Sequence, residues 1–197
     1  MRRHWHERGG NKMKILFIGG TGTISRSISL LLANSPHELT LLNRGDKMDP
    51  SLPDSIHRLY ADIHDEKRVS EMLSSLSFDV VCDFIAFRPE DVCRDIRLFQ
   101  GRCKQFLFIS SASAYQKPLS HYLISESTPL FNPYWQYSRD KIACEEILME
   151  AYRTMSFPIT IVRPSHTYAS GSVPLAIHSP HGAFTDLSRM LAGKPVL

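Results

Sequence analysis

The sequence predicts an α/β protein whose core is a doubly wound parallel β-sheet with helices on both faces. Two observations predict this class. Short, almost wholly apolar runs alternate along the chain with segments in which apolar residues recur at helical spacing. These runs also lack alternation between polar and apolar residues, so both faces of the strands should be buried, as in a parallel sheet covered by helices.

The first strand and helix follow from the clearest of these patterns. The apolar run Ile15–Ile18 is ended by glycines, and Ile24, Ile28 and Leu32 then repeat at helical spacing. We therefore expect a buried strand that leads directly into a helix.

The later elements follow in the same way. Pro89 suits the first position of a helix, and Gly101 suits the residue that follows a helix end. Gly193 fits the end of the last helix, and residues 194–197 resemble the start of another strand, so we expect the chain to stop inside an element. Strands are predicted at 38–42, 57–60, 80–87, 106–110 and 159–162, and helices around 69–76, 89–99, 137–153 and 183–192.

Composition and charge argue against several classes of protein. Of the 197 residues 43% are hydrophobic, enough for one substantial core. The net charge of +3 lies wholly in residues 1–12, so the remainder is neutral and a nucleic-acid partner is not expected. The apolar runs are far shorter than the roughly 20 residues that cross a bilayer, so no membrane segment is expected. The 4 cysteines form no CxxC pair and the 9 histidines are dispersed, which predicts a cytoplasmic protein without a metal site.

A glycine-rich turn follows the first strand. Residues 19–25 read GGTGTIS and stand between that strand and its helix. Glycines at this place let the backbone turn tightly and approach a pyrophosphate, whose charge is met by amide N–H groups at the helix N-terminus. A plain structural turn is the alternative. The candidate cofactor-binding residues of this segment are Gly19, Thr21, Gly22, Thr23 and Ile24.

Two further strand ends carry candidate cofactor contacts. The second strand ends in Asn43 and Arg44, and no carboxylate stands where one would hold the ribose hydroxyls of NAD. We therefore favour NADP, with its 2′-phosphate on Arg44, over NAD; Asn43 could instead bind an unphosphorylated ribose, and Arg44 could be a solvated loop residue. Beyond the third strand, Asp62 and Ile63 could contact the adenine edge, although Asp62 could equally cap the next helix.

A tyrosine and a lysine form the candidate catalytic site. Tyr137 and Lys141 are four residues apart and share a helix face, so the lysine ammonium is expected to lower the pKa of the phenol and make Tyr137 a usable acid or base. Ser110 and Ser111 stand upstream at the end of a strand, where Ser111 would hold a substrate oxygen. A YxxxK string also occurs by chance, and the alternative is a pair on a helix surface.

These segments resemble the extended short-chain dehydrogenase/reductase family, specifically its NAD-dependent epimerase/dehydratase-like proteins, over essentially residues 13–197. GGTGTIS resembles the glycine loop, FLFISSASAY the strand with the catalytic serine, YSRDK the tyrosine–lysine pair and IVRPSHTY the RPxxxYG segment. The resemblance implies that Ser111 is the catalytic serine, that Tyr137 is the acid/base and that Lys141 binds the nicotinamide ribose.

The resemblance also adds residues to the cofactor site and shows where the chain departs from the family pattern. It implies that Ala86 and Pro164 contact the cofactor. Ser25 replaces the last glycine of the loop, Ala169 follows the tyrosine of RPxxxYG where the family has glycine, and FIAF at 84–87 replaces a Leu-Ala-Ala stretch.

The implied activity is reversible hydride transfer between the nicotinamide and an alcohol or keto carbon of a nucleotide-sugar-like substrate, by an epimerase, a dehydratase or a reductase that could form a homodimer. The alternatives are a non-catalytic dinucleotide-binding protein, either a redox sensor or an RNA-associated relative, and an inactive truncated fragment. We expect residues 1–12 to be a disordered or mis-annotated extension before a start at Met13, residues 13–172 to form the NAD(P)-binding Rossmann domain, and residues 173–197 to begin an incomplete substrate domain.

Overall fold

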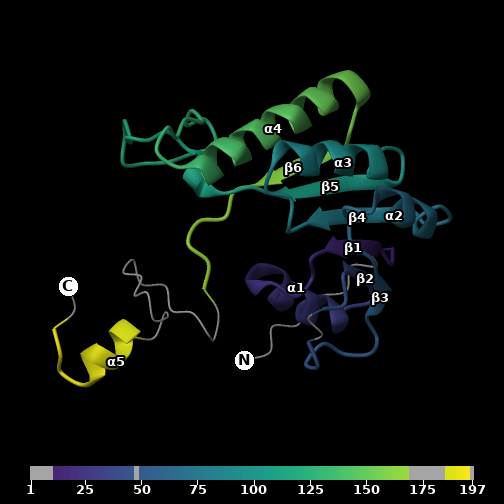
Figure 1. Ribbon diagram of the computed structural model, residues 1–197, viewed down its shortest axis with the longest axis horizontal. Helices are drawn as coiled ribbons and strands as arrows, with labels where there is room; N and C mark the ends of the chain where they lie inside the picture. Colours follow the sequence, from purple (N-terminus) through teal and green to yellow (C-terminus); the bar gives the residue numbers. More distant parts are fainter. Residues whose placement is uncertain (1–10, 47–48, 169–184, 196–197) are drawn as a thin grey trace.

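The structure, a computed structural model, describes residues 11–46, 49–168 and 185–195. Its strands form a parallel sheet in the order β3-β2-β1-β4-β5-β6 (Figure 1). The strands are β1 (Lys14–Ile18), β2 (Glu38–Asn43), β3 (His57–Tyr60), β4 (Phe78–Asp83), β5 (Cys103–Ile109) and β6 (Ile159–Val162). Neighbouring strands all run parallel, and the direction of winding reverses between β1 and β4. This doubly wound order confirms the predicted Rossmann-like sheet.

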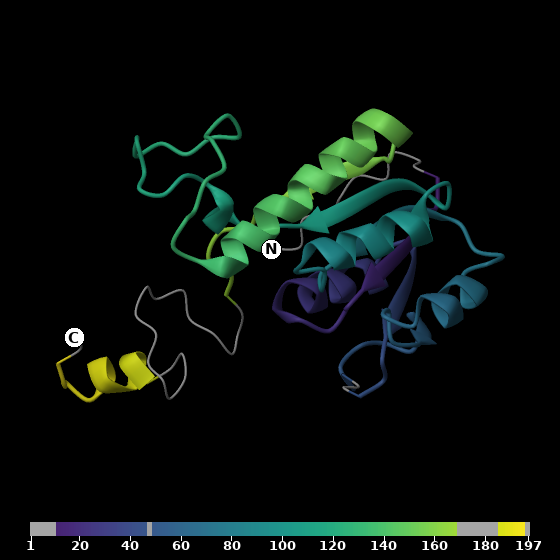
Figure 2. The same ribbon diagram turned by 45° about the horizontal axis from the view of Figure 1, so that its top comes forward.

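Helices cover both faces of this sheet. The covering helices are α1 (Thr23–Ala33), α2 (Glu66–Met72), α3 (Pro89–Phe99) and α4 (Gln136–Met155). The remaining elements are a 3₁₀ turn, η1 (Ala112–Ala114), and a short helix, α5 (Thr185–Leu191), which contributes to neither core. Apolar residues of α2, α3 and α4 pack on one face, where α3 lies beside α4 (Figure 2), and those of α1 pack on the other.

The two cores explain why the strands read as continuous apolar runs. Successive residues of a strand point to opposite faces of the sheet. In β1, Leu16 and Ile18 therefore join the core under α2, α3 and α4, whereas Ile15 and Phe17 join the core under α1. All four side chains are buried. A strand with both faces buried has no polar face to show in its sequence.

Strand β4 ends earlier than predicted. The expected strand covered residues 80–87, but β4 ends at Asp83 and residues 84–87 form a loop. The cause is the Asp83 carboxylate, which accepts the N–H groups of Ile85 at 2.6 Å and Ala86 at 2.8 Å. An aspartate that bonds the backbone two residues on stabilises a turn in place of the next sheet hydrogen bonds.

Helix α2 is also shorter than the predicted helix at 69–76. It ends at Met72, because the N–H of Ser74 bonds to the carbonyl of Glu71 three residues back, at 3.2 Å, and so tightens the last turn. Leu76, expected on the buried face of this helix, lies beyond its end and is exposed.

Of the last two predicted elements, the helix is present and, in the described residues, the strand after it is not. Helix α5 lies within the predicted helix at 183–192, of which residues 183 and 184 are outside the described residues. The strand predicted to begin at Lys194 is absent at Lys194 and Pro195, the two of its residues that the structure describes. The guanidinium of Arg189 donates to the carbonyl of Pro195 at 2.8 Å and the N–H of Lys194 bonds to the carbonyl of Arg189, so this segment folds back on α5.

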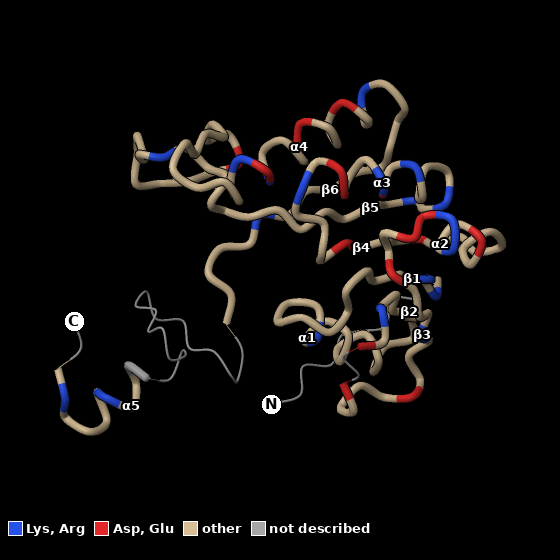
Figure 3. Tube along the Cα trace, viewed as in Figure 1, with Lys and Arg blue, Asp and Glu red and all other residues tan. Residues whose placement is uncertain are grey.

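The surface mixes charges of both signs. Acidic and basic residues are interspersed along α2, α3 and α4 (Figure 3). In the described part of the chain, no helix combines the length and the hydropathy that a membrane span needs, and no three His, Cys, Asp or Glu side chains gather as a metal-binding group. Residues 1–10 and 169–184, which hold most of the predicted extension, Ala169 and much of the predicted second domain, lie outside the described residues.

Candidate active site

A cleft of about 410 Å³ lies at the carboxyl ends of β1, β2, β3 and β4, where the winding of the sheet reverses. Ligands of open α/β sheets bind in the crevice at such a point. Predicted cofactor residues contribute much of its wall, namely Gly19, Thr21, Asn43, Arg44, Asp62 and Ile63. The other lining residues are Leu42, Gly45, Asp46, Ala61, His64, Ile85 and Phe87.

The glycine turn needs its glycines for backbone conformation and close packing. Gly19 has φ of +82°, in the region that favours glycine, and a Cβ there would lie 2.4 Å from the Cγ2 of Ile85. A Cβ on Gly20 would lie 2.4 Å from the Cδ2 of Leu41. Gly22 is the N-cap of α1, and Thr23 and Ile24 form its first turn. The turn therefore leads the backbone past the cleft and into a helix N-terminus, a place where backbone N–H groups bind anions.

Two serines, Ser25 and Ser29, stabilise this turn through hydrogen bonds that the sequence analysis did not predict. Ser25, which stands in place of the family glycine, is buried; its hydroxyl donates to the carbonyl of Gly19 at 2.8 Å and accepts the N–H of Gly22 at 2.9 Å. The hydroxyl of Ser29 donates to the carbonyl of Gly20 at 3.1 Å. The departure at Ser25 thus gives the turn two hydrogen bonds that a glycine could not make.

Arg44 lies at the open side of the cleft. Its Nε is 3.4 Å from the carboxylate of Asp46, and both side chains are 66% exposed. An exposed ion pair of this kind contributes little free energy, about 0 to 1 kcal/mol. The guanidinium is therefore available to an anion that enters the cleft.

Asp62 lines the cleft but does not cap α2. Its carboxylate accepts the N–H of His64 at 3.0 Å. The N-cap of α2 is Asp65, whose carboxylate accepts the N–H of Arg68 at 3.1 Å. The alternative reading of Asp62 as a helix cap is wrong, because the helix begins three residues later than that reading requires.

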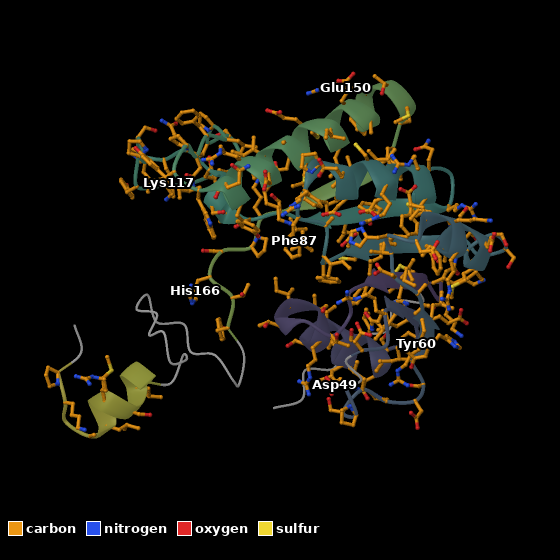
Figure 4. The ribbon with its side chains drawn as sticks, viewed as in Figure 1. Asp49, Tyr60, Phe87, Lys117, Glu150 and His166 are labelled. Atoms are coloured by element: carbon orange, nitrogen blue, oxygen red, sulfur yellow. The ribbon has the colours of Figure 1, made fainter. Side chains whose placement is uncertain are left out.

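Residues of the loop after β4 close the cleft on the side that faces α4. Ile85 packs against Gly19, and both Ile85 and Phe87 line the cleft. Phe87 lies at the sheet edge where β4 ends (Figure 4). Sequence reasoning missed both as site residues; the available signal was that FIAF replaces the small residues of the family stretch. Ala86, a predicted cofactor contact, is buried, and its carbonyl oxygen accepts a hydrogen bond from Lys141.

Lys141 is buried in α4 rather than paired on a helix surface. Its Nζ donates to the carbonyl oxygens of Ala86 and Ile109, both at 2.7 Å, and the side chain is 1% exposed. The rings of Phe87 and Phe108 lie 4.8 and 4.7 Å from Nζ. Burial lowers the pKa of this lysine from 10.5 to about 8. The alternative of a surface pair is therefore wrong.

Tyr137 meets both Lys141 and Ser111. The Nζ of Lys141 lies 5.7 Å from the centre of the Tyr137 ring. Burial raises the pKa of the Tyr137 phenol, and the nearby Ser111 hydroxyl opposes that rise. The expectation that the lysine lowers this pKa is wrong for the protein alone, because desolvation outweighs every other influence on the phenol.

The serines around Ser111 form a chain of hydroxyl groups. Ser111 caps η1, and its Oγ accepts the N–H of Ser113 at 3.1 Å and lies 2.9 Å from the Ser113 hydroxyl. Ser138 in α4 donates to that same hydroxyl at 2.9 Å. The strand end that carries Ser111 is thus tied to the helix that carries Tyr137.

A buried ion pair ties the same helix to β5 and β6. The guanidinium of Arg163 donates to both carboxylate oxygens of Glu145, at 2.6 to 3.1 Å, and the hydroxyl of Ser110 donates to Glu145 as well. Pro164, a predicted cofactor contact, follows Arg163; its carbonyl accepts the N–H of Ala112 at 2.9 Å. Glu145 was missed from the sequence, although it continues the four-residue spacing of Tyr137 and Lys141.

Comparisons with known proteins agree with this fold. The model of the NAD dependent epimerase/dehydratase family matches residues 90–197. The UDP-Glc/GlcNAc 4-epimerase of Campylobacter jejuni is 23% identical with a TM-score of 0.67, covering 76% of this chain and 52% of that one. The UDP-glucuronic acid 4-epimerase of Bacillus cereus, solved in complex with NAD, is 21% identical with a TM-score of 0.68, covering 93% of this chain and 64% of that one.

A curated plant protein is also similar. It is the chloroplast stem-loop binding protein of 41 kDa b of Arabidopsis thaliana, which is 30% identical over an alignment of 119 residues; the alignment covers 54% of this chain and 31% of that protein. The chain spans about half to two thirds of the length of the two epimerases and about a third of the plant protein. The TM-scores to the two solved structures show that this chain shares their fold.

Proposed function

The chain belongs to the NAD dependent epimerase/dehydratase family, and from this premise we propose that it is the cofactor-binding and catalytic part of an NAD(P)-dependent enzyme that acts on an alcohol or keto carbon of a nucleotide-sugar-like substrate. The substrate class is suggested by the two epimerases to which the chain is similar in fold. Epimerisation, dehydration and reduction share the same first step, and the proposal covers all three.

One observation carries this proposal: the three candidate catalytic side chains meet at the edge of the cleft. Phe87 lines the cleft, and its ring lies 6.3 Å from the ring of Tyr137 and 4.8 Å from the Nζ of Lys141. The Ser111 hydroxyl lies close enough to Tyr137 to lower the pKa of the phenol. A molecule that extends from the cleft past Phe87 would approach a hydroxyl and a phenol, with the buried ammonium of Lys141 behind them.

The residues of the cleft fit a nicotinamide dinucleotide. Cβ atoms on Gly19 and Gly20 would clash with the side chains of Ile85 and Leu41. Glycine at both positions is therefore needed for the turn to keep its place beside the cleft. The N-terminus of α1 suits a pyrophosphate, and Arg44 suits a 2′-phosphate. When bound, the nicotinamide ring supplies reversible acceptance and donation of a hydride.

The protein's own groups supply the proton transfer. Tyr137 holds its proton on the phenol oxygen at neutral pH because burial raises its pKa, so in the absence of other charges it is an acid. Ser111 orients the substrate oxygen toward this phenol. Lys141, with a pKa near 8, can carry a positive charge near the phenol at neutral pH and so favour its ionised form when the site needs a base.

The second candidate function is binding of RNA without catalysis. One observation favours it: the plant relative is named for binding a stem-loop. Beyond residue 12, however, acidic and basic residues are equal in number, whereas domains that bind nucleic acid usually carry a basic surplus. The enzyme is therefore the function we favour.

Tyr137→Phe tests the proposal. The change removes the phenol oxygen and should leave dinucleotide affinity nearly intact, while hydride transfer falls by about 10²-fold or more, the scale of general acid–base catalysis. Turnover across a panel of nucleotide sugars would be measured by chromatography of the products, because epimerisation and dehydration return the hydride and leave the nicotinamide absorbance unchanged. Net reduction would be followed from that absorbance. Tyr152→Phe, on the exposed face of α4, is the matched control. Undiminished turnover in Tyr137→Phe would assign the proton transfer elsewhere, and saturable binding of a stem-loop RNA without any dinucleotide binding would favour the second function.

A further inference from the structure

The loop after β4, residues 84–88, has its backbone held by two carboxylates. Asp83 Oδ1 accepts the first two N–H groups at 2.6 and 2.8 Å, and Asp91 Oδ2 accepts the next two at 2.8 and 3.0 Å. The four donors are Ile85, Ala86, Phe87 and Arg88. The path of this loop therefore depends on where the two carboxylates lie.

One arginine contacts both of these carboxylates. The Nη2 of Arg94 lies 3.5 Å from Asp83 Oδ2, and its Nη1 lies 3.2 Å from Asp91 Oδ1. The side chains of Arg94 and Asp83 are 4% and 0% exposed, and that of Asp91 is 14% exposed. Little water reaches these groups, so their attraction is stronger than that of a surface pair. Arg94 thus fixes the relative positions of two anchors that start and end the same loop.

A third carboxylate completes the cluster. Asp95 Oδ1 accepts from Arg94 at 2.8 and 2.9 Å, whereas Asp95 Oδ2 is buried without a hydrogen-bond partner. Burial and the neighbouring Asp83 raise the pKa of Asp95 well above its ordinary value. Asp95 therefore completes a cluster of three carboxylates around Arg94, in which burial and the charge of Asp83 disfavour the ionised form of Asp95.

The loop held in this way forms one side of the candidate site. The carbonyl of Ala86 accepts the Nζ of Lys141 at 2.7 Å, and the Phe87 ring lies 4.8 Å from the same Nζ. The Nη1 of Arg94 also lies 3.3 Å from the Nδ1 of His64, which lines the cleft wall beyond β3. Arg94 therefore contacts groups that belong to two walls of the cleft, although it does not line the cleft itself.

We propose that Arg94 is a positioning residue: through Asp83 and Asp91 it holds loop 84–88 so that the Ala86 carbonyl orients Lys141 and the loop shapes the dinucleotide cleft. This inference rests on the proposed function in one respect, the assignment of Lys141 as a cofactor-binding side chain.

Three conservative variants test it. Arg94→Lys keeps the positive charge but loses the planar fork that reaches several carboxylates at once. Asp83→Asn keeps an oxygen acceptor for the loop but loses the ion pair with Arg94. Asp91→Asn likewise keeps an oxygen acceptor for the loop and loses the ion pair with Arg94. Because the Asp91 side chain is less buried, this variant should disturb the fold least. Arg97→Lys is the matched control, because Arg97 lies on the same helix and pairs on the surface with Glu66.

The first readout needs no cofactor. In protein with ¹³C-labelled lysine, the Cε signal of Lys141, assigned with Lys141→Arg, should titrate near pH 8 in the starting protein. In Arg94→Lys, which leaves both carboxylates charged, the midpoint should move upward toward the ordinary 10.5, because a loosened loop admits water to Nζ. In Asp83→Asn and Asp91→Asn the loss of a carboxylate charge that raises the pKa of Lys141 opposes this shift, so the midpoint should move upward by less than in Arg94→Lys. The control should leave the midpoint unchanged.

The second readout is dinucleotide affinity by calorimetry. It should fall by about ten- to a hundredfold in the variants, the factor that corresponds to losing one charged hydrogen bond. Folded variants that keep both the Lys141 midpoint and the affinity of the starting protein would overturn the role of Arg94. If the starting protein binds no dinucleotide, the proposed function fails, and the Lys141 titration alone still decides whether Arg94 positions the loop.

Discussion

Lys141 places an ionisable nitrogen among aromatic rings and backbone carbonyls, and this environment couples its protonation to folding. Its pKa is about 8 in the folded protein against 10.5 ordinarily. Between these values the unfolded chain binds the proton more tightly than the folded protein does. The stability that depends on neutral Lys141 is therefore present above pH 10.5 and is lost as the pH falls through about 8.

Lys141→Met should remove this pH dependence. The difference in unfolding free energy between the starting protein and the variant should change by about 3 kcal/mol between pH 8 and 10.5, in favour of the starting protein at the higher pH. Urea unfolding at a series of pH values measures it, with Cys144→Ala in both proteins, because the charge of Lys141 lowers the pKa of that thiol. A difference that stays flat with pH would contradict the burial of an ionisable lysine at this place.

We propose that the choice between NADP and NAD depends on Arg44. Its exposed pair with Asp46 is weak, whereas a phosphate bound to a guanidinium contributes about 1.5 to 3 kcal/mol. NADPH should therefore bind at least about tenfold more tightly than NADH, and Arg44→Ala should erase the difference. Calorimetric titration of both cofactors measures this, with Arg97→Ala on α3 as a control for the loss of a surface arginine. Equal affinities of the starting protein for NADPH and NADH would contradict the assignment of NADP as the cofactor.

Helix α4 joins the catalytic side chains to the sheet. Tyr137, Lys141 and Glu145 follow one another at four-residue spacing, so one face of α4 carries all three. The pair of Glu145 with Arg163 fixes this face against the ends of β5 and β6.

Removing the negative charge of the Glu145–Arg163 pair should lower the free energy of unfolding. Glu145→Gln keeps an acceptor but leaves Arg163, whose side chain is 19% exposed, without its counter-charge. The loss of a hydrogen bond between charged groups costs about 1.5 to 3 kcal/mol. Chemical unfolding of Glu145→Gln should show this loss, whereas the neighbouring and exposed Glu146→Gln should change little. Equal effects of the two variants would mean that the buried pair does not hold α4 in place.

Local patterns determine which parts of these elements can be predicted from sequence. The shared face of Tyr137 and Lys141 follows directly from helical spacing, and the glycine turn follows from its place after an apolar run. The end of β4 does not, because Asp83 stops the strand through side-chain bonds to Ile85 and Ala86 within an otherwise apolar stretch. Hydropathy alone continues the strand there.

At the scale of the whole molecule, the sheet order brings together residues that are distant along the chain. The cleft forms because the ends of β1, β2, β3 and β4 meet where the winding reverses, and α4 then approaches it from the side of the β4 loop. The strand pattern predicts this arrangement. The cluster around Arg94 is not predictable in this way, since charged residues that follow one another on a helix usually indicate a solvated face. Only the packing of α3 buries Arg94 and Asp95 beside Asp83 at the end of β4.

The central claim, that this cleft binds a nicotinamide dinucleotide, is tested most directly by following backbone amide signals in an NMR titration with NADP. We predict saturable shifts concentrated at residues 19–25, 43–46, 61–64 and 85–87, which surround the cleft or form its glycine turn. Residues on the exposed side of α4 should not move. No saturable shift, or shifts confined to residues far from the cleft, would contradict the claim.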